Sequence, residues 1–244
     1  MPELIPSKVH YHFFDKSFPH STHLYGKYRA TTSSLLEEIQ HNEEAIVKYT
    51  QAKRLVILQQ IHGNQVIDAD NLTDFSIEPQ ADAVITSQAQ LTLAIQTADC
   101  VPLLVASTDG KIIGAAHCGW KGAKNQIVTY LIELMRAKGA RHFKAVIGPA
   151  IQAASYEVNQ QFYEDFLAQG KHEHLFYPSN RKDHYRFNLP GFVANQLQQN
   201  NVEDILDVKI NTYTSFDRYP SYRHACHLGK EEPARLLSTI FIQA

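Results

Sequence analysis

Short apolar runs separated by turn residues dominate the middle of the chain. Alternating apolar and polar residues, or four to eight apolar residues together, predict β-strands. The runs Val101–Ser107 and Lys111–His117 flank Thr108-Asp109-Gly110, a strong turn sequence, and together they predict a hairpin. The predicted strands cover residues 54–61, 65–68, 83–86, 91–96, 101–107, 111–117, 143–147 and 236–242.

Helical periodicity appears on both sides of these runs. Residues 31–51 open with a threonine and serine cluster that suits a helix N-cap. A second helix is predicted from Ile127 to Met135, with Gly139 beyond its end as a C-terminal cap. Apolar residues at helical spacing predict two more helices, around 162–167 and 189–197.

The grouping of strands in the middle, with helices before and after, favours an α+β fold over a regular βαβ array. We expect mixed β-sheets packed as a sandwich with helices on the outside. The chain shows no internal repeat, low-complexity tract or linker-like segment, so residues 1–244 are expected to form a single domain.

Composition and charge narrow the classes of partner. The formal net charge of −2 gives no sign of nucleic-acid binding, which requires an excess of basic residues overall or on one face. The longest apolar stretch, Val101–Ala106, is far too short to span a bilayer. Residues 1–14 lack an apolar core of signal-peptide length, and three scattered cysteines form no disulfide framework. We therefore expect a cytoplasmic protein that binds neither nucleic acid nor membrane.

Three predicted strand ends each carry a residue that can bind a metal. The residues are His62, Cys100 and His117, and each has glycine or another small residue nearby. A strand end is a rigid place from which to project a ligand. The three segments are Gln59-Gln60-Ile61-His62-Gly63, Thr97-Ala98-Asp99-Cys100-Val101-Pro102 and Gly114-Ala115-Ala116-His117-Cys118-Gly119-Trp120.

Two imidazoles and one thiolate match the ligand count of a catalytic zinc site, which keeps a fourth position open. A thiolate also disfavours magnesium and calcium, which prefer oxygen. Asp99 and Gln60 lie close to these ligands in sequence and could hydrogen-bond to them. Residue chemistry alone leaves another interpretation open, because lone cysteines and strand-end histidines are commonly buried structural residues.

Longer motifs identify a family. The specific pieces are Thr97-Ala98-Asp99-Cys100 and His117-Cys118-Gly119-Trp120-Lys121-Gly122. With segments 59–66, 81–122, 147–158 and 212–242, they resemble the YfiH-type laccase-domain family. Its members are described as purine nucleoside phosphorylases with adenosine deaminase side activity, as polyphenol oxidases and as peptidoglycan-editing factors. The family's metal ligands fall on His62, Cys100 and His117.

Several positions depart from the family pattern. Cys118 stands where the family usually has alanine, and alternation along a strand predicts that it points into the core, away from a metal on His117. Lys121 replaces an arginine and loses its two-pronged grip on phosphate. His224-Ala225-Cys226 replaces a second arginine and an aspartate. Residues 13–16 replace an arginine and a Gly-Gly turn, which weakens the case for an N-terminal phosphate ligand.

The resemblance implies a zinc-dependent purine nucleoside phosphorylase that converts adenosine and phosphate to adenine and ribose 1-phosphate, with possible adenosine deaminase activity. His62, Cys100 and His117 are the expected catalytic and metal-binding residues. The expected substrate- and phosphate-binding residues are Gln60, Asp99, Lys121, Arg223 and Arg235.

Three alternative functions remain open. Two are enzymes that would use the same residues, and the third needs none of them. In a Cys–His hydrolase acting on a peptidoglycan-related or amide substrate, Cys100 is the nucleophile and His117 or His62 its base. A copper-dependent polyphenol oxidase ranks lower, because one His–Cys–His set lacks the further histidines of a multicopper cluster. A non-enzymatic factor in cell-wall precursor quality control needs no intact site. The sequence does not predict an oligomeric state.

Overall fold

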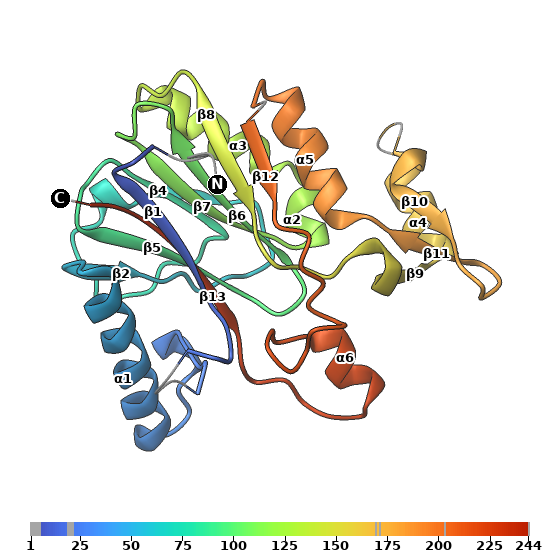
Figure 1. The fold of residues 1–244 in the computed structure, drawn as a ribbon, viewed down its shortest axis with the longest axis horizontal. Coiled ribbons are helices and arrows are strands. Elements are labelled where there is room, and N and C mark those ends of the chain that lie inside the picture. Colours follow the sequence, from blue (N-terminus) through green and yellow to red (C-terminus); the bar gives the residue numbers. More distant parts are fainter. Residues whose placement is uncertain (1–5, 19–21, 169, 171, 203, 244) are drawn as a thin grey trace.

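Two β-sheets stacked face to face form the centre of the molecule (Figure 1). The computed structural model describes residues 6–18, 22–168, 170, 172–202 and 204–243, so the first five residues of the segment considered for a signal peptide lie outside it. In this part of the chain, no helix has the length and apolar character needed to cross a membrane.

The larger sheet has six strands in the order β12-β8-β6-β7-β4-β3, and the smaller has four in the order β1-β13-β5-β2. The strands of the larger sheet are β3 (Val66–Asp68), β4 (Ala83–Thr86), β6 (Val101–Ser107), β7 (Ile113–Cys118), β8 (Phe143–Ile147) and β12 (Asp204–Asp207). Those of the smaller sheet are β1 (Val9–Phe14), β2 (Arg54–Val56), β5 (Leu91–Thr97) and β13 (Leu236–Ile242).

Burial on both faces explains why the central strands are almost wholly apolar. In β6, Leu104 packs into the core between the two sheets, whereas Leu103 packs into the core under the helices. The predicted hairpin is present, with Leu103 of β6 opposite Ala116 of β7. A strand covered on both sides has no solvent-facing positions, so alternation disappears from its sequence.

Helices cover the two outer faces (Figure 1). Helix α1 (Ser33–Thr50) packs Ile46 against Ala94 and Leu237 of the smaller sheet, and Thr32 caps its first turn by accepting the Leu35 N–H. The larger sheet is covered by α3 (Ile127–Ala137) and α5 (Leu189–Gln199), with the short helix α2 (Trp120–Lys124) beside them. Gly139 follows α3 with φ of 114°, as expected of a glycine beyond a helix end. The expected α+β sandwich is therefore confirmed.

One predicted strand is shorter than expected. The strand predicted for residues 54–61 ends at Val56, because the chain then leaves β5 and forms a single bridge from Gln59 to Gln80. Pairing resumes through a side chain, since the Gln60 amide accepts from the Gln96 N–H and donates to the Gln96 carbonyl, both at 2.8 Å. This detour carries the chain to His62.

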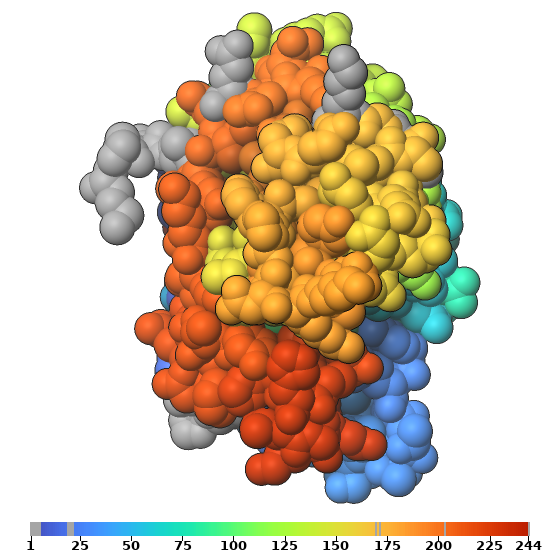
Figure 2. All heavy atoms as spheres, turned by 90° about the vertical axis from the view of Figure 1, so that its right-hand side faces the viewer, coloured from blue at the N-terminus to red at the C-terminus, as the bar shows by residue number. Residues whose placement is uncertain are grey.

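Several elements were not predicted from the sequence. They are β1, β12, α2, α6 (Tyr222–His227), and a small sheet of β9 (Glu157–Asn159), β10 (Phe176–Pro178) and β11 (His184–Phe187) that accompanies α4 (Gln160–Leu167). Figure 2 shows the small sheet and α4, in yellow and orange, lying above the red α6 segment. The Arg223 guanidinium joins the two by donating to the Glu157 carbonyl.

Candidate active site

His62, Cys100 and His117 converge from three separate segments. His117 lies in β7, Cys100 immediately precedes β6, and His62 follows the detour after β2. Their ligand atoms all lie within 4.8 Å of one another, so the group could hold one metal ion. His117 is buried and His62 is exposed, so the group extends from the core to the surface.

Gly119 makes room for this convergence. A Cβ atom at this position would lie 3.3 Å from both the Cys100 sulfur and the His62 ring. Any larger residue would therefore press on two of the three candidate ligands. The close approach of Cys100 and His62 therefore explains why a glycine occupies position 119 of the His117-Cys118-Gly119 motif.

Asp82 forms hydrogen bonds to two of the three candidate ligands, His62 and His117. Its side chain is fully buried, and its Oδ1 accepts from the His62 N–H at 2.9 Å and lies 2.8 Å from His117 Nδ1. Its Oδ2 accepts from the N–H groups of Gly63 at 2.7 Å and Ile61 at 3.2 Å. When Nδ1 of His117 donates to this carboxylate, Nε2 is left with its lone pair for a metal.

No role for Asp82 was predicted, although Ala81-Asp82-Ala83 belongs to the motifs that carry the family resemblance. The sequence around Asp82 nevertheless indicates a buried carboxylate. An acid placed at the start of an apolar strand and flanked by alanines is buried, and a buried carboxylate needs several donors.

The ionisation of the group favours a thiolate. Burial opposes ionisation of Cys100, but His117 and His62 outweigh it and lower the pKa of the thiol to about 6. Burial would also lower the pKa of His117, but the charges of Cys100 and Asp82 raise it to about 9. A thiolate is the form that binds zinc, and it is equally the form that acts as a nucleophile.

Cys118 is not part of the group. It is fully buried in the core beneath the helices, together with Leu103 and Ala116, and burial raises the pKa of its thiol. The predicted core position is confirmed. All three cysteines, including the exposed Cys226, are free thiols.

Two cavities meet at the candidate ligands. One, of about 280 Å³, is bounded by the aromatic side chains of Trp120, Tyr156 and Tyr222, and we call it the aromatic cavity. The other, of about 320 Å³, is lined by Arg29 and Arg235, and we call it the cationic cavity. His62, Ala98, Cys100 and Tyr222 line both.

Arg29 is a second functional candidate, after Asp82, that the sequence analysis does not single out. The departures at residues 13–16 suggest that the N-terminal region lacks a cation for the site, yet Arg29 reaches the cationic cavity from the short 3-10 helix η1 (Lys27–Arg29). Burial and the charge of Arg29 lower the pKa of Arg235. Two guanidinium groups therefore interact at this cavity, a suitable arrangement for an oxyanion.

The cationic cavity also contains unpaired polar atoms. Both polar atoms of the Gln96 side chain and the Thr97 hydroxyl are buried and, within the described part of the chain, have no hydrogen-bond partner. Both residues line the cavity. Buried polar groups without a partner are costly, which favours a polar ligand beside them.

Two of the expected substrate-binding residues are arginines that line different cavities. Arg235 lines the cationic cavity, and its guanidinium is oriented by the carbonyls of Glu232 and Ala234 at 2.6 and 2.7 Å. Arg223 lines the aromatic cavity, 5.2 Å from the centre of the Tyr156 ring. These two cations therefore face the same ligand group from different sides.

The remaining three are placed differently. Asp99 lines the aromatic cavity, but its carboxylate accepts from the Thr212 hydroxyl at 2.7 Å and the Arg223 N–H at 2.6 Å. Gln60 lines the cationic cavity with its amide already bonded to the backbone of β5. Lys121 lines neither cavity; it is exposed on α2, with its ammonium 5.6 Å from the Trp120 ring.

An α+β sandwich with this His–Cys–His group defines a laccase-domain protein. The family described as multi-copper polyphenol oxidoreductase laccase matches residues 13–243, and the chain belongs to it. A protein of Rickettsia conorii named purine nucleoside phosphorylase is 42% identical over 244 residues, covering 100% of both chains. The YfiH-type resemblance seen in the sequence is thus confirmed.

Solved structures support the same fold. Neisseria meningitidis protein NMB0706, of the DUF152 family, superposes with a TM-score of 0.84 at 23% identity, covering 99% of this chain and 97% of that one. The YfiH protein of Bacillus licheniformis superposes with a TM-score of 0.73 at 22% identity, covering 85% and 82%. At such identities the likeness concerns the fold alone.

Proposed function

We propose that this chain is a zinc-dependent purine nucleoside phosphorylase that converts adenosine and phosphate to adenine and ribose 1-phosphate. The observation that carries the proposal is the position of the His–Cys–His group between an aromatic and a cationic cavity. A purine nucleoside needs an aromatic surface for its base, and phosphate needs cations. The name of the Rickettsia conorii relative agrees with this chemistry.

The chain's own residues account for binding and orientation. Trp120, Tyr156 and Tyr222 would provide aromatic surface for the purine, while Arg29 and Arg235 would bind phosphate in the cationic cavity. In phosphorolysis a phosphate oxygen forms a bond to the ribose C1′, the bond from C1′ to the base nitrogen breaks, and its electron pair leaves with the purine, which takes up a proton. Fixing both reactants in one site removes much of the entropic barrier.

His62, Cys100 and His117 are the proposed zinc ligands, because two imidazoles and a thiolate fit zinc and Asp82 orients the His117 ring. Bound zinc would supply Lewis-acid polarisation of the substrate, and the same chemistry would serve adenosine deamination. Copper is the less favoured metal, since the described residues contain a single His–Cys–His group rather than a multicopper cluster. We place the reaction in the cytoplasm, where free thiols persist.

A Cys–His hydrolase is the second candidate, because the lowered pKa of Cys100 beside His117 also describes an activated nucleophile. Metal content separates the two proposals. We expect about one zinc per chain by elemental analysis, and loss of most of it in Cys100→Ala, because a methyl group cannot replace a ligating thiolate. Cys118→Ala is the matched control and should keep its zinc.

Unchanged zinc in Cys100→Ala, or zinc lost equally from both variants, would contradict the proposed ligand set. A wild-type protein that hydrolyses an amide substrate without any transition metal would favour the hydrolase instead.

A further inference from the structure

Residues 26–29 form one wall of the cationic cavity, through Tyr28 and Arg29. The chain turns sharply at Gly26, whose φ of 84° lies in the left-handed region, and a Cβ there would lie 2.6 Å from the Tyr28 ring. A glycine turn permits this path but does not enforce it. Something else must fix the direction in which Arg29 leaves the turn.

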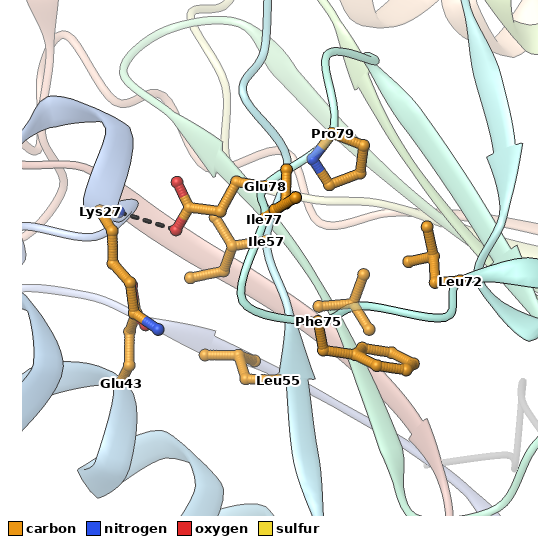
Figure 3. Close-up of a pocket in the computed structure, with 10 residues that line it drawn as sticks. Lys27, Glu43, Leu55, Ile57, Leu72, Phe75, Ile77, Glu78 and Pro79 are labelled. Atoms are coloured by element: carbon orange, nitrogen blue, oxygen red, sulfur yellow. Dashed lines mark hydrogen bonds between the residues drawn. The ribbon is translucent and has the colours of Figure 1, made fainter.

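Two carboxylates hold this segment by its backbone. Glu78 accepts from the Lys27 N–H at 2.7 Å with one oxygen and from the Tyr28 N–H at 2.9 Å with the other. Glu43, on α1, accepts from the Gly26 N–H at 3.0 Å. Three successive N–H groups thus donate to carboxylate oxygens, and Figure 3 shows the bond from Lys27 to Glu78.

Apolar side chains lie beside the two carboxylates. Leu55, Ile57 and Phe75 line the small cavity that Glu43 and Glu78 share (Figure 3). The bonds from Gly26 and Lys27 are partly buried, whereas the bond from Tyr28 is exposed. Neither carboxylate lines the cationic or the aromatic cavity, so any influence on a ligand there must pass through the backbone they hold.

We propose that Glu78, with Glu43, is a positioning residue that holds the backbone of residues 26–28 and thereby directs Arg29 into the cationic cavity. The inference rests on the proposed function in one respect, the assignment of phosphate as the ligand of Arg29. Charge alone predicts the opposite effect, because a carboxylate near a phosphate site repels phosphate. Removing the charge of Glu78 should therefore strengthen phosphate binding if only charge matters, and weaken it if Glu78 positions Arg29.

Backbone exchange tests the hold on the segment without any reference to activity. In Glu78→Gln an NH2 group replaces one of the two acceptor oxygens, so at least one of the amides of Lys27 and Tyr28 should exchange with deuterium about tenfold faster than in the wild type. Glu44→Gln is the control, because Glu44 is exposed on the same helix as Glu43. Amides of β6 should stay protected in both variants, which verifies the fold.

Calorimetric titration of the zinc-loaded proteins with inorganic phosphate tests the consequence for Arg29. Phosphate binding should weaken about tenfold in Glu78→Gln and stay within about twofold of the wild type in Glu44→Gln. Glu78→Asp keeps the charge but shortens the reach, so it should also weaken phosphate binding. In turnover assays the KM for phosphate should rise in both Glu78 variants, while the KM for adenosine changes little.

Unchanged exchange in Glu78→Gln, or phosphate that binds equally or more tightly there, would overturn the positioning role. Phosphate binding in Glu78→Asp as tight as in the wild type would overturn it as well, because a side chain one methylene shorter cannot hold both N–H groups in the same place. If the wild type binds no phosphate yet Glu78→Gln still exchanges faster, the hold on the segment stands. Phosphorolysis as the function is then rejected.

Discussion

At the scale of single residues, the buried carboxylate of Asp82 ties together parts of the site that are distant in sequence. It contacts the ring of His117 and the backbone on both sides of His62. Burial opposes its ionisation, but its hydrogen bond to His117 and its N–H donors lower the pKa of Asp82 below the usual value. One residue therefore sets the orientation of two candidate ligands.

Asp82→Asn should weaken zinc binding by about 10- to 100-fold, because the amide nitrogen would face N–H donors and loosen the support of His117. Competition with a chelator of known zinc affinity measures this. Asp109→Asn, a surface acid beside a turn, is the control and should bind zinc like the wild type. Equal zinc affinity in the two variants would show that Asp82 does not orient the ligands.

Some residues of the site could be predicted from the sequence and others could not. His62, Cys100 and His117 could be predicted because each is a metal-capable residue at the end of an apolar run. Arg29 could not, because nothing local distinguishes it from a surface arginine. Its place depends on Glu43 and Glu78, which hold its segment from distant parts of the chain.

At the scale of elements, the long periodic helices and the apolar strands of the core were predictable, whereas β1 and several short elements were not. Helix α1 and the hairpin of β6 and β7 carry their pattern within the segment itself. Strand β12 and the small sheet of β9–β11 have few residues each, and their pairing partners supply the information that their own sequences lack. The aromatic and cationic cavities lie where such short elements meet, so their shape was also beyond prediction.

Glu43 gives helix α1 a measurable pH dependence. Burial first, and then the charge of Glu78, raise the pKa of Glu43 from 4.5 to about 7. The folded state therefore binds the proton more tightly than the unfolded state, and the stability that this provides is lost as pH rises from about 4.5 through about 7. Above about pH 7 the buried Glu43 carboxylate is ionised, and this lowers the stability of the folded state.

Glu43→Gln keeps an oxygen for the Gly26 N–H and carries no charge. It should be close to the wild type in free energy of unfolding at pH 5 and more stable at pH 8.5, by up to roughly 3 kcal/mol. Urea unfolding at the two pH values measures the difference, with Glu44→Gln as control. A variant that is less stable than the wild type at pH 8.5 would show that the charged form of Glu43 is favourable.

At the scale of the whole molecule, the sandwich places ends of β6 and β7, the loop that follows β2, and residues from the N- and C-terminal regions around one group. The cationic cavity combines Arg29 from the N-terminal region with Arg235 just before β13, the last strand. The aromatic cavity combines Trp120 from α2 with Tyr156 and Tyr222. The two cavities share His62, Ala98, Cys100 and Tyr222, so two ligands bound in them would lie beside the same group.

The most direct test of the proposed function is the product mixture from adenosine, separated by chromatography, with zinc-loaded protein in the presence and absence of phosphate. We predict adenine and ribose 1-phosphate with phosphate and almost no adenine without it, because Arg29 and Arg235, the proposed phosphate ligands, line the cationic cavity beside His62. Adenine formed at the same rate without phosphate, or inosine as the only product under both conditions, would contradict phosphorolysis.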